Sequence, residues 1–113
     1  MGLSKDEDVR RAVDACLNCF KVCLDTEAEC LKLGGALSRA GHITLLNSCA
    51  QSCMLSADYM LRRFKLNAQM CSLCAIVCDE CAVSCETFKE DFMIECAKVC
   101  RSTADSCRRK ANR

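Results

Sequence analysis

The residues of this chain with the most distinctive chemistry are its cysteines, which number 14 among 113 residues. Most recur at steps of three and four, and two follow their cluster by seven. These steps return a helix to the same face. The sequence therefore predicts helices whose inward positions, usually held by leucine, carry thiols. The positions are Cys16, Cys19, Cys23, Cys30, Cys49, Cys53, Cys71, Cys74, Cys78, Cys81, Cys85, Cys96, Cys100 and Cys107.

Three other roles are considered for these cysteines: disulfide bonds, an iron–sulfur cluster and a zinc site. Disulfides are disfavoured, because cysteines three or four apart on one helix point the same way. The run from Cys71 through Cys74 to Cys78 begins like a ferredoxin motif, but it lies on a predicted helix and lacks the following proline. Zinc accepts Cys-x2-Cys pairs, yet it takes four thiolates, and each such site keeps a net charge of about −2 that is costly to bury.

Cu(I) suits a thiol-lined core better. It is a soft ion that prefers thiolate ligands. Each Cu(I) that binds displaces one proton, so the filled core stays neutral. Because one thiolate can bridge two ions, we expect a capacity on the order of ten to fourteen ions. The interpretation is storage or buffering of multiple Cu(I) ions, and the alternative is a zinc-buffering or thiol-redox protein.

The elements that must position these thiols are four helices. The stripes predict them over about residues 5–33, 42–64, 67–86 and 88–110. Capping boxes that begin at Ser4 and Thr87 are expected to start the first and fourth helices. The acidic turn from Asp6 to Asp8 is expected to match the helix dipole on a solvated face. A glycine pair at 34–35 should end the first helix.

The least marked boundary lies near Lys65, where neither glycine nor proline indicates a turn. The cysteine register still favours a break there. Cys53 and Met60 extend in heptads to Asn67 and Cys74, whereas Cys71, Cys78 and Cys85 lie one position off the complementary row. Short connections favour antiparallel neighbours. We therefore predict an all-α, up-down-up-down four-helix bundle with a cysteine-lined core, forming one domain over residues 1–113.

Composition and termini narrow the functional class. The net charge of +1 gives no electrostatic case for nucleic acid or an anionic membrane. The polar start of the chain lacks a signal region, and no apolar stretch is expected to span a bilayer. We expect a cytoplasmic protein, where thiols stay reduced. A single histidine and the lack of a paired acid and base or a phosphate loop indicate that it is not an enzyme.

The two ends of the predicted bundle differ. One gathers Leu33, Leu37, Ile43, Leu46, Phe88 and Phe92, and the other gathers Cys16, Met60, Cys71 and Cys107 with Met70 close by. We expect copper to enter at the sulfur-rich end, with Met60 as a further ligand. Met70 is a weaker candidate, and Met54 and Met93 are weaker still, since methionine commonly fills core gaps. His42 lies at the apolar end, where a histidine at a helix start more often caps the helix or faces solvent.

The spacings, the length and the four-helix pattern resemble the copper storage proteins, a Cys-rich four-helix-bundle family. The resemblance covers nearly everything from Val9 to Arg109. It implies that all fourteen cysteines bind Cu(I), that the chain is of the cytosolic kind, and that it forms a homo-oligomer, with a tetramer expected. Copper ions are the expected partners, together with proteins that donate or accept them. The stripes lack a thiol at Thr26, Ser56 and Thr103, which implies gaps in the copper array.

Overall fold

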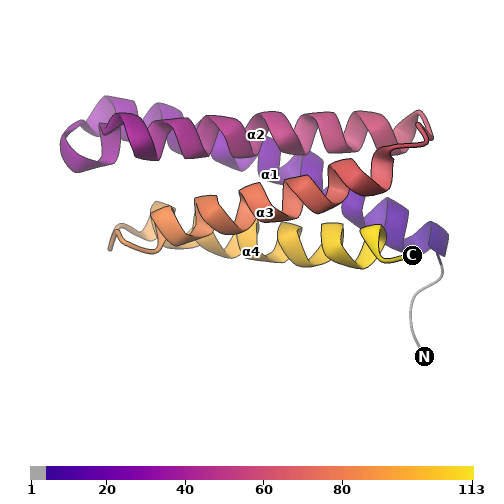
Figure 1. Cartoon of the computed structure of the whole chain (residues 1–113). Helices are drawn as coiled ribbons and strands as arrows, with labels where there is room; N and C mark the ends of the chain where they lie inside the picture. The colour runs from indigo at the N-terminus through magenta and orange to yellow at the C-terminus, as the bar shows by residue number, and fades with distance from the viewer. Residues whose placement is uncertain (1–4) are drawn as a thin grey trace.

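The computed structural model describes residues 5–113, which form four α-helices and one short 3-10 helix. In chain order these are α1 (Lys5–Leu33), η1 (Gly35–Ser38), α2 (Ala40–Leu61), α3 (Asn67–Cys85) and α4 (Asp91–Ala111). Successive helices are antiparallel and build an up-down-up-down bundle measuring 43 × 27 × 17 Å (Figure 1). The predicted fold class is confirmed.

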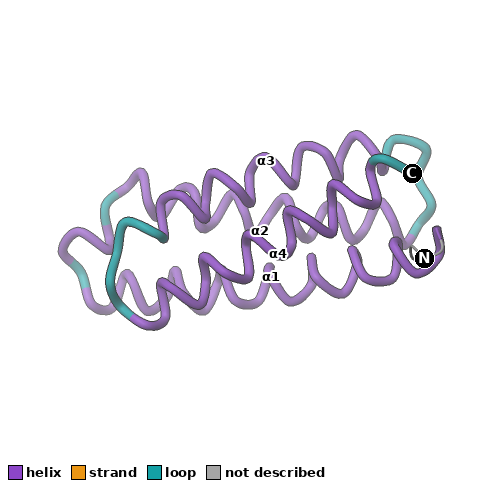
Figure 2. Tube along the Cα trace, turned by 90° about the horizontal axis from the view of Figure 1, so that it is seen from below, coloured by secondary structure: helices purple, strands orange, loops and turns teal. Residues whose placement is uncertain are grey.

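Each helix packs against two neighbours around one core. α1 contacts α2 and α4, and α3 contacts the same two helices, so α1 and α3 lie diagonally across the bundle. The connections α1–α2 and α3–α4 lie at one end, and the α2–α3 turn lies at the other end together with the start of α1 and the end of α4 (Figure 2).

The helix termini carry the charges that the helix dipole favours. Acidic residues occupy the first turn of α1, and Arg108, Arg109 and Lys110 occupy the last turn of α4. Asp8 departs from the prediction of a solvated face, because its side chain is fully buried and pairs with Arg113. Ser4, which was expected to cap α1, lies outside the described residues.

Two turns follow the sequence closely. Gly34 has a φ of 75°, which favours glycine, and its N–H donates to the carbonyl of Cys30 at 3.0 Å, so α1 ends at Leu33. The predicted break near Lys65 is present, since α2 ends at Leu61 and α3 begins at Asn67. The reversal there places Arg63 in the left-handed region, with a φ of 56°.

The predicted start of α4 is wrong. Thr87 does not cap this helix, because it lies four residues before the first residue of α4, and its hydroxyl donates to the carbonyl of Ser84 in α3 at 2.7 Å. α4 begins instead at Asp91, and its N-cap residue, Glu90, makes no side-chain capping bond. A capping oxygen accepts from an N–H of the first helical turn, whereas the Thr87 hydroxyl bonds locally to the carbonyl three residues before it.

The prediction that no apolar stretch could span a bilayer is wrong for α3. α3 is long and apolar enough to do so by length and composition, with a mean hydropathy of 1.4. Five of its residues are cysteines that raise this value while facing the bundle core. The helix packs between α2 and α4, and 44% of this apolar stretch is buried inside the bundle.

The core is made of thiols separated by small residues. All fourteen cysteine side chains have an exposed fraction of 0%. Buried alanines adjoin them on every helix: Ala12, Ala50, Ala57, Ala75, Ala82, Ala97 and Ala104. Because alanine and cysteine are both small, the helices can approach closely enough for sulfur atoms of different helices to meet.

Candidate metal centre

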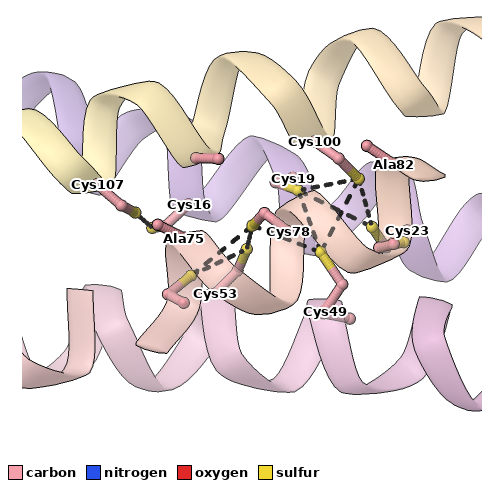
Figure 3. Close-up of a cluster of buried hydrophobic side chains, with 14 of the residues drawn as sticks. Cys16, Cys19, Cys23, Cys49, Cys53, Ala75, Cys78, Ala82, Cys100 and Cys107 are labelled. Carbon is pink, nitrogen blue, oxygen red and sulfur yellow. Dashed lines mark hydrogen bonds between the residues drawn. The ribbon is translucent and has the colours of Figure 1, made fainter. Parts of the chain in front are cut away.

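The central group of thiols comes from three helices. Cys19 and Cys23 of α1 meet Cys49 of α2 and Cys100 of α4, and the four sulfur atoms all lie within 4.8 Å of one another. The Sγ–Sγ distance is 3.8 Å from Cys19 to Cys49 and from Cys23 to Cys100 (Figure 3). This spacing allows several thiolates to contact the same soft ion or adjacent ions.

A second group continues the first along the bundle axis. Cys53 and Cys78 join Cys19 and Cys49, again with all sulfur atoms within 4.8 Å. Cys49 Sγ lies 3.6 Å from Cys78 Sγ, and Cys53 Sγ lies 3.7 Å from Cys78 Sγ. Because Cys19 and Cys49 belong to both groups, the thiols form one connected array.

A third group extends the array toward the end where the α2–α3 turn lies. Cys16, Cys53 and Cys74 share a 4.8 Å neighbourhood, and Cys74 Sγ lies 3.7 Å from Cys53 Sγ. Beyond them, Cys16 Sγ lies 3.4 Å from Cys107 Sγ. Thiols from all four helices are therefore connected in sequence along the core (Figure 3).

The sulfur-rich end is close to solvent. Met60 and Met70 have exposed fractions of 4% and 9%, and Met60 lines an open cavity of about 650 Å³. Cys71 Sγ lies 3.3 Å from the hydroxyl of Ser56, one of the expected gaps in the stripes. Arg113 Nε donates to the buried Asp8 Oδ2 at 2.6 Å and so ties the end of α4 to the start of α1.

The opposite end is covered by side chains and by η1. Leu46 is fully buried and Leu37 nearly so. His42 is buried rather than solvent-facing, with an exposed fraction of 6%. Its Nδ1 lies 2.7 Å from Ser84 Oγ, and its ring centroid lies 4.7 Å from that of Phe88. Burial lowers the pKa of His42, so the ring is neutral at pH 7.

Met93 belongs to this covered end, and the sequence alone makes it one of the weakest methionine candidates for a ligand. Its side chain is fully buried, and the thiol of Cys30 donates to its Sδ at 3.6 Å. Met93 precedes Cys96 by three residues, so the helical spacing that selected the cysteines could also have selected this thioether. Buried Asp8 was missed as well, because an acidic first turn usually faces solvent.

Burial and neighbouring groups set the proton affinity of the thiols. Burial raises the pKa of Cys30 to about 11, and the negative charges near it act in the same direction. A hydrogen bond from Cys107 lowers the pKa of Cys71 to about 7, and the positive charge of Lys110 also lowers it. Neighbouring thiols, followed by burial, raise the pKa of Cys53, Cys85 and Cys107.

The structure brings eight of the predicted ligands into the three close groups and buries the other six around them. The eight are Cys16, Cys19, Cys23, Cys49, Cys53, Cys74, Cys78 and Cys100. The other six are Cys30, Cys71, Cys81, Cys85, Cys96 and Cys107. All fourteen are free thiols. The hydroxyls of Thr26 and Thr103 donate to the carbonyls of Val22 and Val99 of their own helices, at 2.7 and 2.8 Å.

Comparison with known proteins agrees with this geometry. The family model described as copper storage protein matches residues 5–112. The chain is 31% identical over 99 residues to the uncharacterized cysteine-rich protein YhjQ of Bacillus subtilis (strain 168), covering 88% of this chain and 92% of that one.

Solved structures give the same result. Protein Nmul_A1745 of Nitrosospira multiformis has a TM-score of 0.89 at 37% identity, covering 95% of this chain and 97% of that one. Apo copper storage protein 3 of Bacillus subtilis has a TM-score of 0.82 at 32% identity, covering 90% and 97%. The Cu(I)-bound copper storage protein BsCsp3 has a TM-score of 0.87 at 30% identity, covering 92% and 98%.

Proposed function

The chain belongs to the copper storage protein family, and on this premise we propose that the thiols of its core hold many Cu(I) ions at once. The observation that carries the proposal is the connected array, in which Cys19 and Cys49 each belong to two groups of four sulfur atoms. A shared thiolate can bridge two Cu(I) ions. The core then stores several ions in one continuous cluster rather than in separate sites.

Charge favours Cu(I) over zinc in this core. Two closed zinc tetrathiolate sites cannot share Cys19 and Cys49 and still remain independent tetrahedra. Each would also bury a net charge of about −2. The buried polar residues of the described chain are Asp8, Thr26, His42, Ser56 and Thr103, which include no lysine or arginine to balance it. Cu(I) thiolates avoid this cost because each ion replaces one proton.

The proposed ligands are the fourteen cysteines, with Met60 as a further ligand where copper enters. Met60 supports this role because it is buried and lines the cavity at the sulfur-rich end. Met70 lies at the same end with an exposed fraction of 9%. Copper passes inward from there by exchange between neighbouring thiolates.

We also propose where the protein acts and in what role. We place the protein in the cytoplasm, since fourteen free thiols persist where thiols are kept reduced. The four helices act as one domain because they share one core. The role is storage and not catalysis, and donor and acceptor proteins supply and collect the copper.

We also propose a homo-oligomer, with the outer face of α3 in its interface. Leu73, Ile76 and Val83 have exposed fractions of 51%, 59% and 54% on this helix. Such a row is unusual on the surface of a monomer. Light scattering on Ile76→Glu should show a smaller species than the unchanged chain, while Asn18→Glu, which adds the same charge at an exposed position of α1, diagonally across the bundle, should not.

A competition between metals tests the storage function. The reduced apoprotein is equilibrated with excess Zn(II), and Cu(I) is then added anaerobically in steps. We expect Cu(I) to displace any zinc and to continue binding well beyond four ions per chain. Retention of zinc against Cu(I) would favour the zinc-buffering alternative.

A further inference from the structure

The cavity at the sulfur-rich end has the size of a small-molecule site. Its volume is about 650 Å³, within the range of about 300–1,000 Å³ that such sites occupy. It is bounded by the start of α1, the end of α2, the α2–α3 turn and the end of α4. A single Cu(I) ion needs far less space, so the cavity has room for a larger ligand.

The rim of this cavity is cationic. Lys5, Arg10, Arg63 and Lys110 line it, against two carboxylates, those of Asp6 and Asp14. Within residues 5–113, the salt bridges involve other groups and none neutralises these four cations. Lys110 Nζ donates to Asn67 Oδ1, which also lines the cavity. With four cations against two carboxylates the rim has an excess of positive charge that suits a carboxylate ligand.

Backbone strain adds a second observation at the same place. Arg63 has a φ of 56°, a conformation that glycine adopts at lower cost. Its N–H donates to the carbonyl of Met60 at 3.1 Å, which fixes the reversal after α2. Strained residues of this kind cluster at ligand sites, and here the strained position carries a guanidinium that lines the cavity.

The floor of the cavity adjoins the thiol array. Met60 and Val13 are buried at its base. Two lining residues are close in sequence to core thiols. Asn67 lies four residues before Cys71, and Lys110 lies three residues after Cys107, so each of the two is about one helical turn from a thiol. A ligand held at the rim would thus place a metal ion next to Met60, with Cys71 one helical turn beyond the lining residue Asn67.

We propose that this cavity binds Cu(I) as a complex with a small thiol that bears carboxylates, and that the cationic rim holds those carboxylates during transfer. This inference rests on the proposed storage function and names the form in which the ion arrives. Cu(I) bound by two thiolates is anionic, and carboxylates add further negative charge, which matches the rim.

The transfer is a balanced ligand exchange. The two bonds from Cu(I) to the carrier sulfurs break, and bonds from Cu(I) to Cys71 Sγ and Met60 Sδ form. The proton of the Cys71 thiol passes to one carrier thiolate, which leaves as a neutral thiol, and the other carrier leaves as a thiolate. Copper stays in the +1 state throughout, so no oxidant or reductant is needed.

Loading rates from two donors test the inference. Cu(I)–glutathione carries carboxylates, whereas Cu(I)–cysteamine is a thiol complex without them. In the triple variant Lys5→Gln, Arg10→Gln, Arg63→Gln, we expect the ratio of the glutathione rate to the cysteamine rate to fall by about tenfold. The control variant Lys21→Gln, Lys32→Gln, Arg39→Gln removes the same charge from exposed positions away from the cavity and should keep the original ratio.

The outcomes separate the inference from the storage function. An unchanged donor ratio in the cavity variant, or an equal fall in the control variant, would overturn the carrier site. The final number of ions per chain reports on storage alone. If that number were low in the unchanged protein with both donors, the storage function itself would fail.

Discussion

A cysteine in place of leucine changes what a core position can do. Its side chain is small and apolar enough to be buried at every one of the fourteen positions. Neighbouring sulfur atoms in the described array lie 3.4 to 4.0 Å apart. This spacing lets one thiolate contact two Cu(I) ions, each of which replaces a proton.

Loss of one central thiol should lower the copper capacity. Cys100 Sγ contacts Cys23 and Cys49 at 3.8 and 3.9 Å. We expect Cys100→Ser to bind about one to two fewer Cu(I) ions per chain, since a hydroxyl does not replace a soft ligand. Ala104→Ser introduces a buried hydroxyl on the same helix without removing a thiol and should keep the full capacity. Equal capacity in Cys100→Ser and the unchanged protein, measured by anaerobic titration, would contradict the ligand role.

Filling a gap should have the opposite effect. Ser56 is fully buried, and its hydroxyl lies 3.3 Å from Cys71 Sγ. The variant Ser56→Cys adds a thiol beside an existing one, so we expect about one more Cu(I) per chain. Ser56→Ala removes the hydroxyl without adding sulfur and serves as the control. A Ser56→Cys chain that binds no more copper than Ser56→Ala would show that this gap is not beside a copper position.

At this scale the sequence predicts the thiols well and their surroundings poorly. Periodicity identifies inward cysteines because steps of three and four need no knowledge of neighbouring helices. The bond between His42 and Ser84 joins α2 to α3, and the pair Asp8–Arg113 joins α1 to α4. Such contacts depend on the packing of distant segments, which spacing within one helix does not encode.

The four helices are predictable as elements, and their ends only in part. α1 ends at the glycine pair as predicted, because the turn there requires the positive φ that Gly34 adopts. The predicted start of α4 is wrong, because the helix begins at Asp91 and Thr87 donates to Ser84 in the preceding helix. A capping pattern in the sequence does not show where the turn places the threonine relative to the first N–H groups of the next helix.

Gly34 and Gly41 flank the connection between α1 and α2, and their alanine variants form a matched pair. Gly34 has a φ of 75° and a ψ of −160°, a region essentially restricted to glycine, so Gly34→Ala should lower the free energy of unfolding by about 1–3 kcal/mol through backbone strain alone. Gly41 lies inside α2 with open space around it, and Gly41→Ala should raise this free energy by about 0.5–1 kcal/mol. Anaerobic urea unfolding of the apoprotein measures both. Changes of the same sign would show that the conformation of Gly34 does not limit the turn.

The molecule as a whole combines a protonated core with a different structure at each end. Residues around η1 cover one end, and the other opens through a cationic cavity beside Met60. The core itself contains no cation among its buried, described residues. Its electrostatic balance therefore depends on whether protons or Cu(I) ions occupy the thiols.

This balance predicts a specific response to alkaline pH. Burial raises the pKa of Cys30 to about 11, and neighbouring thiols raise that of Cys85. Unfolded thiols ionise near pH 9, so these groups stabilise the apoprotein fully below that pH. Their contribution is lost as pH rises from about 9 toward 11. Groups with a lowered pKa, such as Cys71 at about 7, are ionised in both states above pH 9 and do not oppose the loss.

Thermal unfolding followed by circular dichroism checks this response. The Tm of the reduced apoprotein should fall between pH 9 and 11, while that of the copper-loaded protein should change much less, because its thiols no longer carry protons. The loaded protein contains the same lysines and the same tyrosine, so it serves as the control for the apoprotein. Parallel declines in the two forms would place the effect outside the thiol core.

The most direct test of a neutral copper array is native mass spectrometry of the reduced protein after anaerobic loading with Cu(I). The number of ions and the number of displaced protons follow from the same mass. We predict on the order of ten to fourteen ions per chain, with about one proton lost for each. Saturation at three or four ions, or a proton count far from one per ion, would contradict storage in a connected array of thiolates.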